Sequence, residues 1–253
     1  MTARVVKIGG AALADATWLS SFAAAAAASG APMVIVHGGG PDISALSDRL
    51  GIEVSWHEGR RVTSHATLDV AAMVLNGRIN KRVVGALVNA GVDAIGISGV
   101  DGGLLRAEIV EDGALGRVGR IDTVRVSLLH ALLDLGHSVV VSPISLGADG
   151  EPLNVNADDA AAAVAAALGA EELVFLTDVP GVRNATGLCA DLDVDQAACL
   201  VQDGTASGGM SVKLGAGMKA LRSGVRAVRI GDARVLFDDA AGTVLHPVYV
   251  GAA

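Results

Sequence analysis

VVKIGG, residues 5–10, and VIVHGGGP, residues 34–41, decide the fold that this sequence predicts. In each stretch a short run of aliphatic residues ends in glycines, and the second stretch continues through Pro41 into a helical pattern. Proline suits the first turn of a helix, so the pattern indicates a buried strand, a tight turn and a helix. Such a turn can be a bare backbone connection, or it can aim its N–H groups at an anionic ligand.

Strands and helices alternate along the rest of the chain. The expected strands are 5–8, 33–36, 93–98, 138–142, 173–177 and 225–230, and the expected helices are 15–29, 41–50, 64–89, 127–136, 158–168, 193–202 and 211–223. Three further segments are a β-hairpin on the sheet edge (104–110 with 115–126), a loop (179–192) and a final extended stretch (242–251). This alternation predicts an α/β fold, a three-layer αβα sandwich with a central, mostly parallel sheet.

Composition limits the class of protein. The 253 residues are 51% hydrophobic and only 2% aromatic, which suits one domain (1–253) of small aliphatic side chains packed between strands and helices. No apolar run reaches the roughly 18 residues of a membrane span, and the first residues do not resemble a signal peptide. We therefore expect a cytoplasmic protein without a membrane partner. The net charge of −8 argues against nucleic acid as a partner.

The cysteines predict no metal site. Cys189 and Cys199 are ten residues apart, and no CxxC pair or histidine at ligand spacing accompanies them.

Three known glycine motifs are absent. No Gly-Lys dipeptide occurs, so there is no Walker A loop, and no G-x-G-x-x-G dinucleotide fingerprint occurs. HGGG is also found in some esterases, but no serine lies in a G-x-S-x-G elbow. Ser98 comes closest, with Gly96 two positions before it but Val100 in place of the second glycine two positions after it. The glycine turns can still form a phosphate-binding site, with a lysine supplied by another part of the chain.

Lysine is scarce, with four lysines (Lys7, Lys81, Lys213 and Lys219) in a chain that has 19 Lys and Arg together. Lys7 precedes Gly9 by two residues, and Lys213 follows Gly208-Gly209 at a helix start. Each is either a solvated surface charge or a compact ammonium kept for an anion. If the first two strands are adjacent and parallel, both glycine turns reach the carboxyl edge of the sheet, where open α/β folds bind ligands.

The motifs together resemble the amino acid kinase family, and within it the members that phosphorylate N-acetyl-L-glutamate. The resemblance spans nearly the whole chain and is carried by VVKIGG, VIVHGGGP, GRRVT (59–63), MVLNGRINK (73–81), the stretch 153–182 that begins LNVNADD and ends TDVPGV, and SGGMSVK (207–213). It implies the amino acid kinase fold, with an acyl-substrate lobe over about 1–150 and a nucleotide lobe over about 151–253. It also implies ATP with Mg²⁺, the metal arriving with the nucleotide, and phosphorylation of a side-chain carboxylate in arginine biosynthesis.

The resemblance also assigns roles. Lys7 and Lys213 would stabilise the transferring phosphoryl group from opposite sides, with Asp158 accepting hydrogen bonds from both; Asp158 is otherwise a carboxylate at a helix N-terminus. The remaining implied contacts are Gly9 and Gly10 to phosphate, Gly39, Gly40, Arg61 and Asn154 to the acyl substrate, and Thr177, Asp178, Val179, Pro180, Gly181, Val182, Thr205, Ala206 and Ser207 to the nucleotide. Arg60 is a rival to Arg61.

Two alternative functions stay open. One is a kinase acting on carrier-linked aminoadipate or glutamate, which would need a basic docking surface such as Arg117, Arg120 and Arg125. The other is a non-catalytic sensor of amino acid or nucleotide on the same fold. Because the chain begins almost at the first strand, without the N-terminal helix of the hexameric members, we expect a homodimer without arginine feedback.

Overall fold

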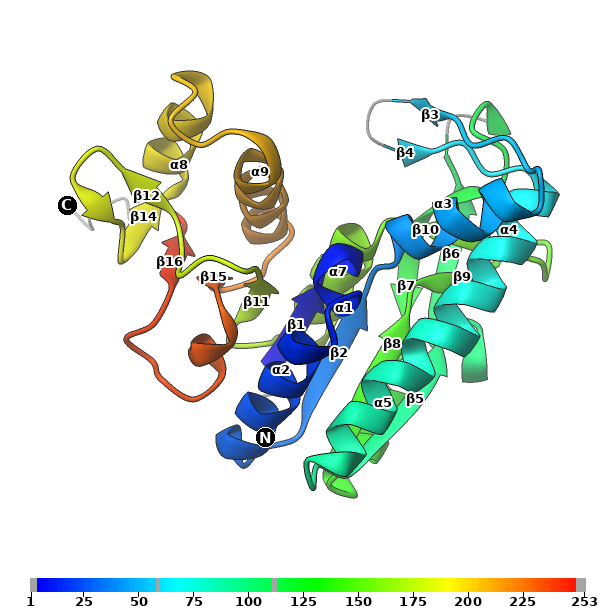
Figure 1. Cartoon of the computed structure of the whole chain (residues 1–253), viewed down its shortest axis with the longest axis horizontal. Helices are drawn as coiled ribbons and strands as arrows, with labels where there is room; N and C mark the ends of the chain where they lie inside the picture. The colour runs from blue at the N-terminus through cyan, green and yellow to red at the C-terminus, as the bar shows by residue number, and fades with distance from the viewer. Residues whose placement is uncertain (1–3, 58–59, 111–112, 249–253) are drawn as a thin grey trace.

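The computed structural model describes residues 4–57, 60–110 and 113–248, which fold around an eight-stranded sheet (Figure 1). In spatial order its strands are β14 (Asp191–Asp193), β16 (Thr243–His246), β15 (Val228–Gly231), β11 (Leu173–Leu176), β1 (Arg4–Ile8), β2 (Met33–His37), β8 (Ser138–Ser142) and β5 (Ala94–Ser98). Every neighbouring pair is parallel except β15 with β16. The predicted, mostly parallel sheet is confirmed.

Helices cover both faces of the sheet. Side chains alternate along a strand, so Val5 faces one layer and Val6 the other. The layer on the Val5 face holds α6 (Val126–Asp134), α7 (Ala157–Leu168), α8 (Val194–Gln202) and α9 (Gly208–Arg222). The layer on the Val6 face holds α1 (Gly10–Leu13), α2 (Ala16–Ser29), α3 (Gly40–Arg49), α4 (His65–Ala72), α5 (Asn80–Asn89) and η4 (Ala233–Leu236). The three-layer αβα sandwich is therefore confirmed.

The predicted hairpin exists, but its expected place on the edge of the main sheet was wrong. Its strands, β6 (Leu105–Ile109) and β7 (Val118–Val124), pair with each other and close a separate barrel with β9 (Ile144–Gly147) and β10 (Pro152–Val155). β9 and β10 are four residues each, too short to show a periodic pattern, and their pairing with β6 and β7 is set by contacts distant in sequence. The barrel delivers Asn154, on β10, to the carboxyl side of the main sheet.

The predicted helix over 64–89 forms a single rod with a change of winding. α4 leads into a π-helix, η1 (Met73–Ile79), and then into α5. The Ser64 side chain accepts a hydrogen bond from the N–H of Thr67, as expected of the cap. The π-helix was not predicted, because sequence periodicity does not separate π from α winding, and π turns often accompany functional sites.

The remaining short elements lie in connections. They are β3 (Trp56–His57) with β4 (Arg60–Arg61), η2 (Asp101–Gly103), and β12 (Arg183–Asn184) with β13 (Gly187–Leu188) inside the expected loop. Gly59 of the GRRVT motif and positions 249–251 of the expected final segment lie outside the described residues.

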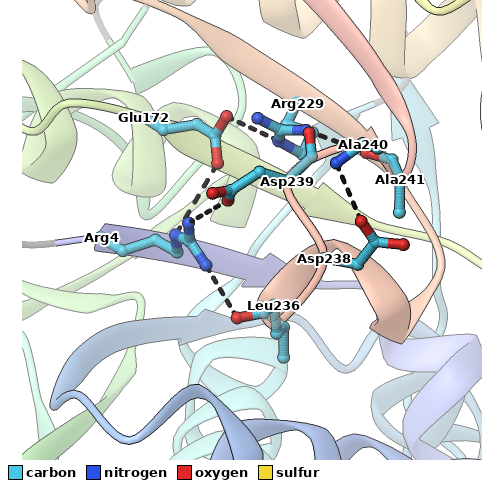
Figure 2. A network of polar contacts seen from close by, with 8 residues as sticks. All are labelled: Arg4, Glu172, Arg229, Leu236, Asp238, Asp239, Ala240 and Ala241. Atoms are coloured by element: carbon cyan, nitrogen blue, oxygen red, sulfur yellow. Dashed lines mark hydrogen bonds and ion pairs between the residues drawn. The ribbon is translucent and has the colours of Figure 1, made fainter.

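A network of ion pairs joins the first strand to the last loop, at the end of the sheet opposite the glycine turns (Figure 2). Glu172 is 8% exposed; its Oε1 lies 2.7 Å from Arg229 Nε and its Oε2 lies 3.7 Å from Arg4 Nε. Arg229 Nη1 also donates to the carbonyls of Asp239 and Ala241, which tie the loop before β16 to the sheet.

Replacing Glu172 with alanine is expected to lower the free energy of unfolding by about 3 kcal/mol, because it leaves buried guanidinium charge without its carboxylate. Urea denaturation followed by circular dichroism measures the change. The matched control is Glu171→Ala, which removes an exposed neighbouring carboxylate and should cost less than about 0.5 kcal/mol. Equal losses in the two variants would contradict the structural role of the network.

Candidate active site

The two glycine turns meet at the carboxyl edge of the sheet. β1 and β2 are adjacent and parallel, with Ile8 opposite His37, so the turns that follow them lie side by side. The N–H of Gly38 donates to Ile8 O at 2.9 Å. A Cβ added to Gly10 would lie 2.7 Å from Gly39 Cα, which means that only glycine allows this approach. The expected convergence of the two turns is confirmed.

A cavity of about 220 Å³ opens beside these turns. Seven of the predicted site residues line it: Lys7, Gly10, Gly39, Gly40, Arg61, Asn154 and Asp158. They come from β1, β4, β10, α7 and the starts of α1 and α3, so distant parts of the chain supply one pocket. Gly9, Lys213 and the predicted nucleotide residues do not belong to its lining.

Lys7 and Asp158 form the central ion pair of the site. Lys7 projects from the same face of β1 as Val5, toward the layer that contains α7, and its Nζ lies 2.8 Å from Asp158 Oδ1. Asp158 occupies the first turn of α7, where Asn156 caps the helix by accepting from the N–H groups of Asp158 and Asp159. The positive end of the helix dipole and the lysine ammonium therefore both lie next to this carboxylate.

Lys213 lies on α9 within electrostatic range of this pair but does not bond to Asp158. Its Nζ is 3.5 Å from Gly209 O, within its own helix. Burial lowers the pKa of the Lys213 ammonium, and the positive charge of Lys7 lowers it further, while Asp158 and Asp178 oppose the shift. In this structure Asp158 thus forms an ion pair with one lysine, and its contact with the second stays a prediction.

Arg61 is buried yet incompletely bonded. Its Nη2 donates to Gly40 O at 3.0 Å and to Ser44 Oγ at 2.8 Å, and its guanidinium lies 4.4 Å from the ring centre of Trp56. Nη1 is buried and has no hydrogen-bond partner in the described part of the chain. Burial lowers the pKa of this guanidinium. A buried donor in a cavity wall fits an oxygen ligand, because leaving it unpaired is costly.

Asn154 joins Arg61 through a threonine. Asn154 Nδ2 donates to Thr63 Oγ1 at 3.0 Å, and Thr63 Oγ1 donates to Arg61 O at 2.8 Å. The barrel and the β3–β4 hairpin are thereby fixed to each other at the pocket wall.

The predicted nucleotide residues follow β11, the other neighbour of β1. Thr177 and Val182 are buried, and the Val182 N–H donates to Thr243 Oγ1 at 2.8 Å. Thr205, Ala206 and Ser207 precede α9, and Ser207 occupies its N-cap without a side-chain bond. Asp178 lines a separate hollow of about 640 Å³ between α2 and η4. Asp178 acts electrostatically on Lys213, and Val182 and Ala206 share a core cluster with Leu214 of the same helix.

Sequence reasoning missed three features of the site. Trp56 covers Arg61, and Asp159, beside Asp158, contacts Lys219 of α9. His37 and Asn80 form a buried pair beneath the triple-glycine turn. The small number of lysines was the signal that could have drawn attention to Lys219.

The described residues include no cluster of three His, Cys, Asp or Glu side chains able to hold a metal ion. Across residues 4–57, 60–110 and 113–248, no helix combines the length and apolar character needed to span a membrane.

Comparison with known proteins gives one consistent relationship. The sequence profile of the Amino acid kinase family matches residues 2–232. An acetylglutamate kinase of Roseiflexus castenholzii is 48% identical over 228 residues, covering 89% of this chain and 88% of the relative. An acetylglutamate kinase of Chloroflexus aurantiacus is 46% identical over 232 residues, covering 90% and 91%.

Among solved structures, carbamate kinase from Giardia lamblia bound to AMP-PNP superposes with a TM-score of 0.70 over 97% of this chain and 98% of that chain. The two chains are 18% identical in sequence, so this structural similarity shows that they share a fold and nothing more.

Proposed function

The chain belongs to the amino acid kinase family, and from this premise we propose that it transfers the γ-phosphoryl group of ATP to the side-chain carboxylate of N-acetyl-L-glutamate. The product is N-acetyl-L-glutamyl 5-phosphate, and the reaction belongs to arginine biosynthesis. The observation that carries the proposal is the pocket in which both glycine turns, the Lys7–Asp158 pair and the unpaired Arg61 Nη1 meet.

The chemistry needs little from the protein beyond position and charge. The acceptor carboxylate is ionised at neutral pH, since its ordinary pKa is about 4.3, and no general base is required. A carboxylate oxygen attacks the γ-phosphorus while the bond to the bridging oxygen breaks, and its electron pair leaves with ADP. We propose that Lys7 and Lys213 neutralise the charge on the transferring group, with Asp158 holding the Lys7 ammonium.

The acyl substrate is proposed to lie against Gly39 and Gly40, with its α-carboxylate on Arg61 and with Asn154 beside it. The unpaired Nη1 of Arg61 supports this orientation, because its N–H groups are left to donate to a carboxylate oxygen while Nη2 is held by Gly40 O and Ser44 Oγ. Lys7 and Asp158 line the same pocket, and we propose that the side-chain carboxylate meets the phosphoryl group beside them.

The nucleotide is proposed to bind across the next strand. Gly9 and Gly10 would donate to phosphate oxygens, and positions 177–182 and 205–207 would line the adenosine site in a nucleotide lobe over about 151–253. Mg²⁺ would arrive as part of the co-substrate MgATP, since phosphate oxygens and water are its usual ligands. An ATP-dependent biosynthetic step suits the cytoplasm.

A homodimer is proposed as the assembly. Met73 and Val88, on the helical rod that packs beside the edge strand β5, are 59% and 55% exposed and are available for a subunit contact. Sedimentation equilibrium of the purified protein tests this, and a single species of monomer mass would exclude it.

The proposed reaction is tested by offering N-acetylglutamate, glutamate, aspartate and aminoadipate separately with MgATP and trapping acyl phosphate with hydroxylamine. We expect turnover with N-acetylglutamate well above that with the other acids. No turnover with N-acetylglutamate would overturn the assignment.

A carrier-linked substrate is not favoured by the expected docking surface. Arg117 lies 2.6 Å from Asp149 and Arg120 lies 3.3 Å from Glu108, so acidic neighbours offset two of its three charges.

Replacing Arg61 with lysine is expected to raise KM for N-acetylglutamate about thirtyfold while KM for ATP stays within twofold. Lysine keeps the charge but loses the Nη1 donor, the anchoring of Nη2 by Gly40 and Ser44, and the stacking on Trp56, a loss of about 2 kcal/mol. Initial-rate kinetics with each substrate varied in turn measures the split. Arg60→Lys serves as the comparison, and a larger rise in that variant would transfer the role to Arg60.

A further inference from the structure

His37 is the last residue of β2 and immediately precedes the triple-glycine turn. Its side chain is fully buried, and both of its ring nitrogens have partners. Nδ1 lies 3.2 Å from Gly38 O, and Nε2 lies 3.3 Å from Asn80 Nδ2. The predicted reaction gives this histidine no role.

Asn80 determines which tautomer of His37 is present. Its Nδ2 shares two N–H groups among three acceptors, Val140 O at 3.0 Å, Ile97 O at 3.3 Å and His37 Nε2 at 3.3 Å, and its Oδ1 accepts from Lys81 Nζ at 3.2 Å. These partners fix the orientation of the amide, so its nitrogen faces His37. Nε2 must then accept, and the ring proton lies on Nδ1, where it donates to Gly38 O. Burial lowers the pKa of His37 to about 4, which agrees with a neutral ring.

The Asn80 amide is itself held firmly. It lies where the π-helix ends and α5 begins, and its side chain is pressed against β5: a Cβ added to Gly96 would lie 2.0 Å from Asn80 Oδ1. Lys81 Nζ also donates to Gly96 O at 2.9 Å. The His37–Asn80 pair thus connects β5, β8 and α5 to the triple-glycine turn.

The fixed carbonyl has a consequence for the next residue. Gly38 C=O and Gly39 N–H belong to one planar peptide unit, so fixing the direction of the oxygen also fixes the direction of the N–H. The preceding peptide is held as well, because Gly38 N–H donates to Ile8 O. Glycine alone would leave this turn many conformations.

We propose that His37 and Asn80 are positioning residues for the acyl substrate: the His37 Nδ1–H holds the Gly38 carbonyl and thereby aims the Gly39 N–H into the pocket. The proposal rests on the proposed function for the identity of the substrate, N-acetyl-L-glutamate. It assigns neither residue a contact with substrate or with the transferring phosphoryl group.

The kinetic test compares His37→Phe, which keeps a ring but removes both nitrogens, with His37→Asn, whose amide can place a donor near the former Nδ1. We expect His37→Phe to raise KM for N-acetylglutamate about tenfold with KM for ATP within twofold, and His37→Asn to recover at least half of that loss on a logarithmic scale. Equal rises in both KM values, or no advantage of asparagine over phenylalanine, would overturn the proposal.

A second measurement uses the wild-type protein and does not depend on the folding of a variant. ¹⁵N NMR of the imidazole should show His37 protonated on Nδ1 and unprotonated on Nε2 at neutral pH. Titration with N-acetylglutamate should shift the Gly39 amide signal. The opposite tautomer, or a Gly39 signal that does not move while the substrate binds, would overturn the proposal. Failure of the wild-type protein to turn over N-acetylglutamate would instead overturn the proposed function and leave the tautomer result standing.

Discussion

Lys213→Ala is expected to lower kcat about a thousandfold while KM for ATP changes by no more than a few fold. Negative charge on the transferring group and its surroundings is redistributed in the transition state, so an ammonium placed there acts mainly on kcat. Losses of this size accompany removal of one charged or hydrogen-bonding stabiliser in comparable reactions. Steady-state kinetics with saturating N-acetylglutamate separates the two constants.

The matched control is Arg222→Ala, which removes an exposed cation from the last turn of the same helix and should leave kcat within twofold. An unchanged kcat in Lys213→Ala would show that the wrong lysine was chosen. The pH dependence of kcat gives a further readout. Because the pKa of Lys213 is lowered, its ammonium loses the proton as pH rises through that lowered pKa, and kcat is expected to fall over the same pH range. Lys213→Arg, which stays protonated, should move this alkaline fall to higher pH.

Gly10→Ala is expected to reduce kcat/KM by about a hundredfold. The added Cβ would lie 2.7 Å from Gly39 Cα and 2.8 Å from Gly39 N, and backbone atoms cannot rotate away as a side chain can. The two glycine turns must therefore move apart, and a displacement of about 1 Å between reacting groups can cost a hundredfold in rate. Kinetics together with circular dichroism distinguishes a displaced site from an unfolded protein.

The control for this substitution is Gly85→Ala on α5, where an added Cβ meets no described atom within 4 Å. Alanine favours the helix there, so activity should be unchanged and stability equal or higher. Wild-type kcat/KM in a folded Gly10→Ala variant would show that contact between the turns is not needed.

Much of the fold was predictable because it depends on local patterns. Aliphatic runs ended by glycine predicted the buried strands. The convergence of the two glycine turns required in addition that β1 and β2 be adjacent and parallel, which the structure shows. The barrel was not predictable in the same way. β9 and β10 are short, and each pairs with a strand distant in sequence. Residues of β9 lie 40 positions from their partners on β6, and residues of β10 lie 36 positions from their partners on β7.

The residues of the site also differ in how far the sequence predicts them. Lys7 lies next to a glycine turn and Asp158 next to a helix cap, and both features can be recognised in the sequence. The pairing of His37 with Asn80 could not be derived, because it needs the winding of the π-helix and the packing of Asn80 against β5. Contact of Asp158 with Lys213 stays a prediction that a complex with both substrates would test.

The order of strands in the sheet bears on synthesis of the protein in the cell. β1 lies in the interior of the sheet, between β2 and β11, yet β11 ends at Leu176 and is made long after β1 leaves the ribosome. Until then a nascent chain that has folded β1, β2, β8 and β5 presents β1 as an unpaired, hydrophobic edge. Such an edge invites association with other chains, so the interval between translation of β1 and of β11 is the period when this polypeptide most needs a chaperone.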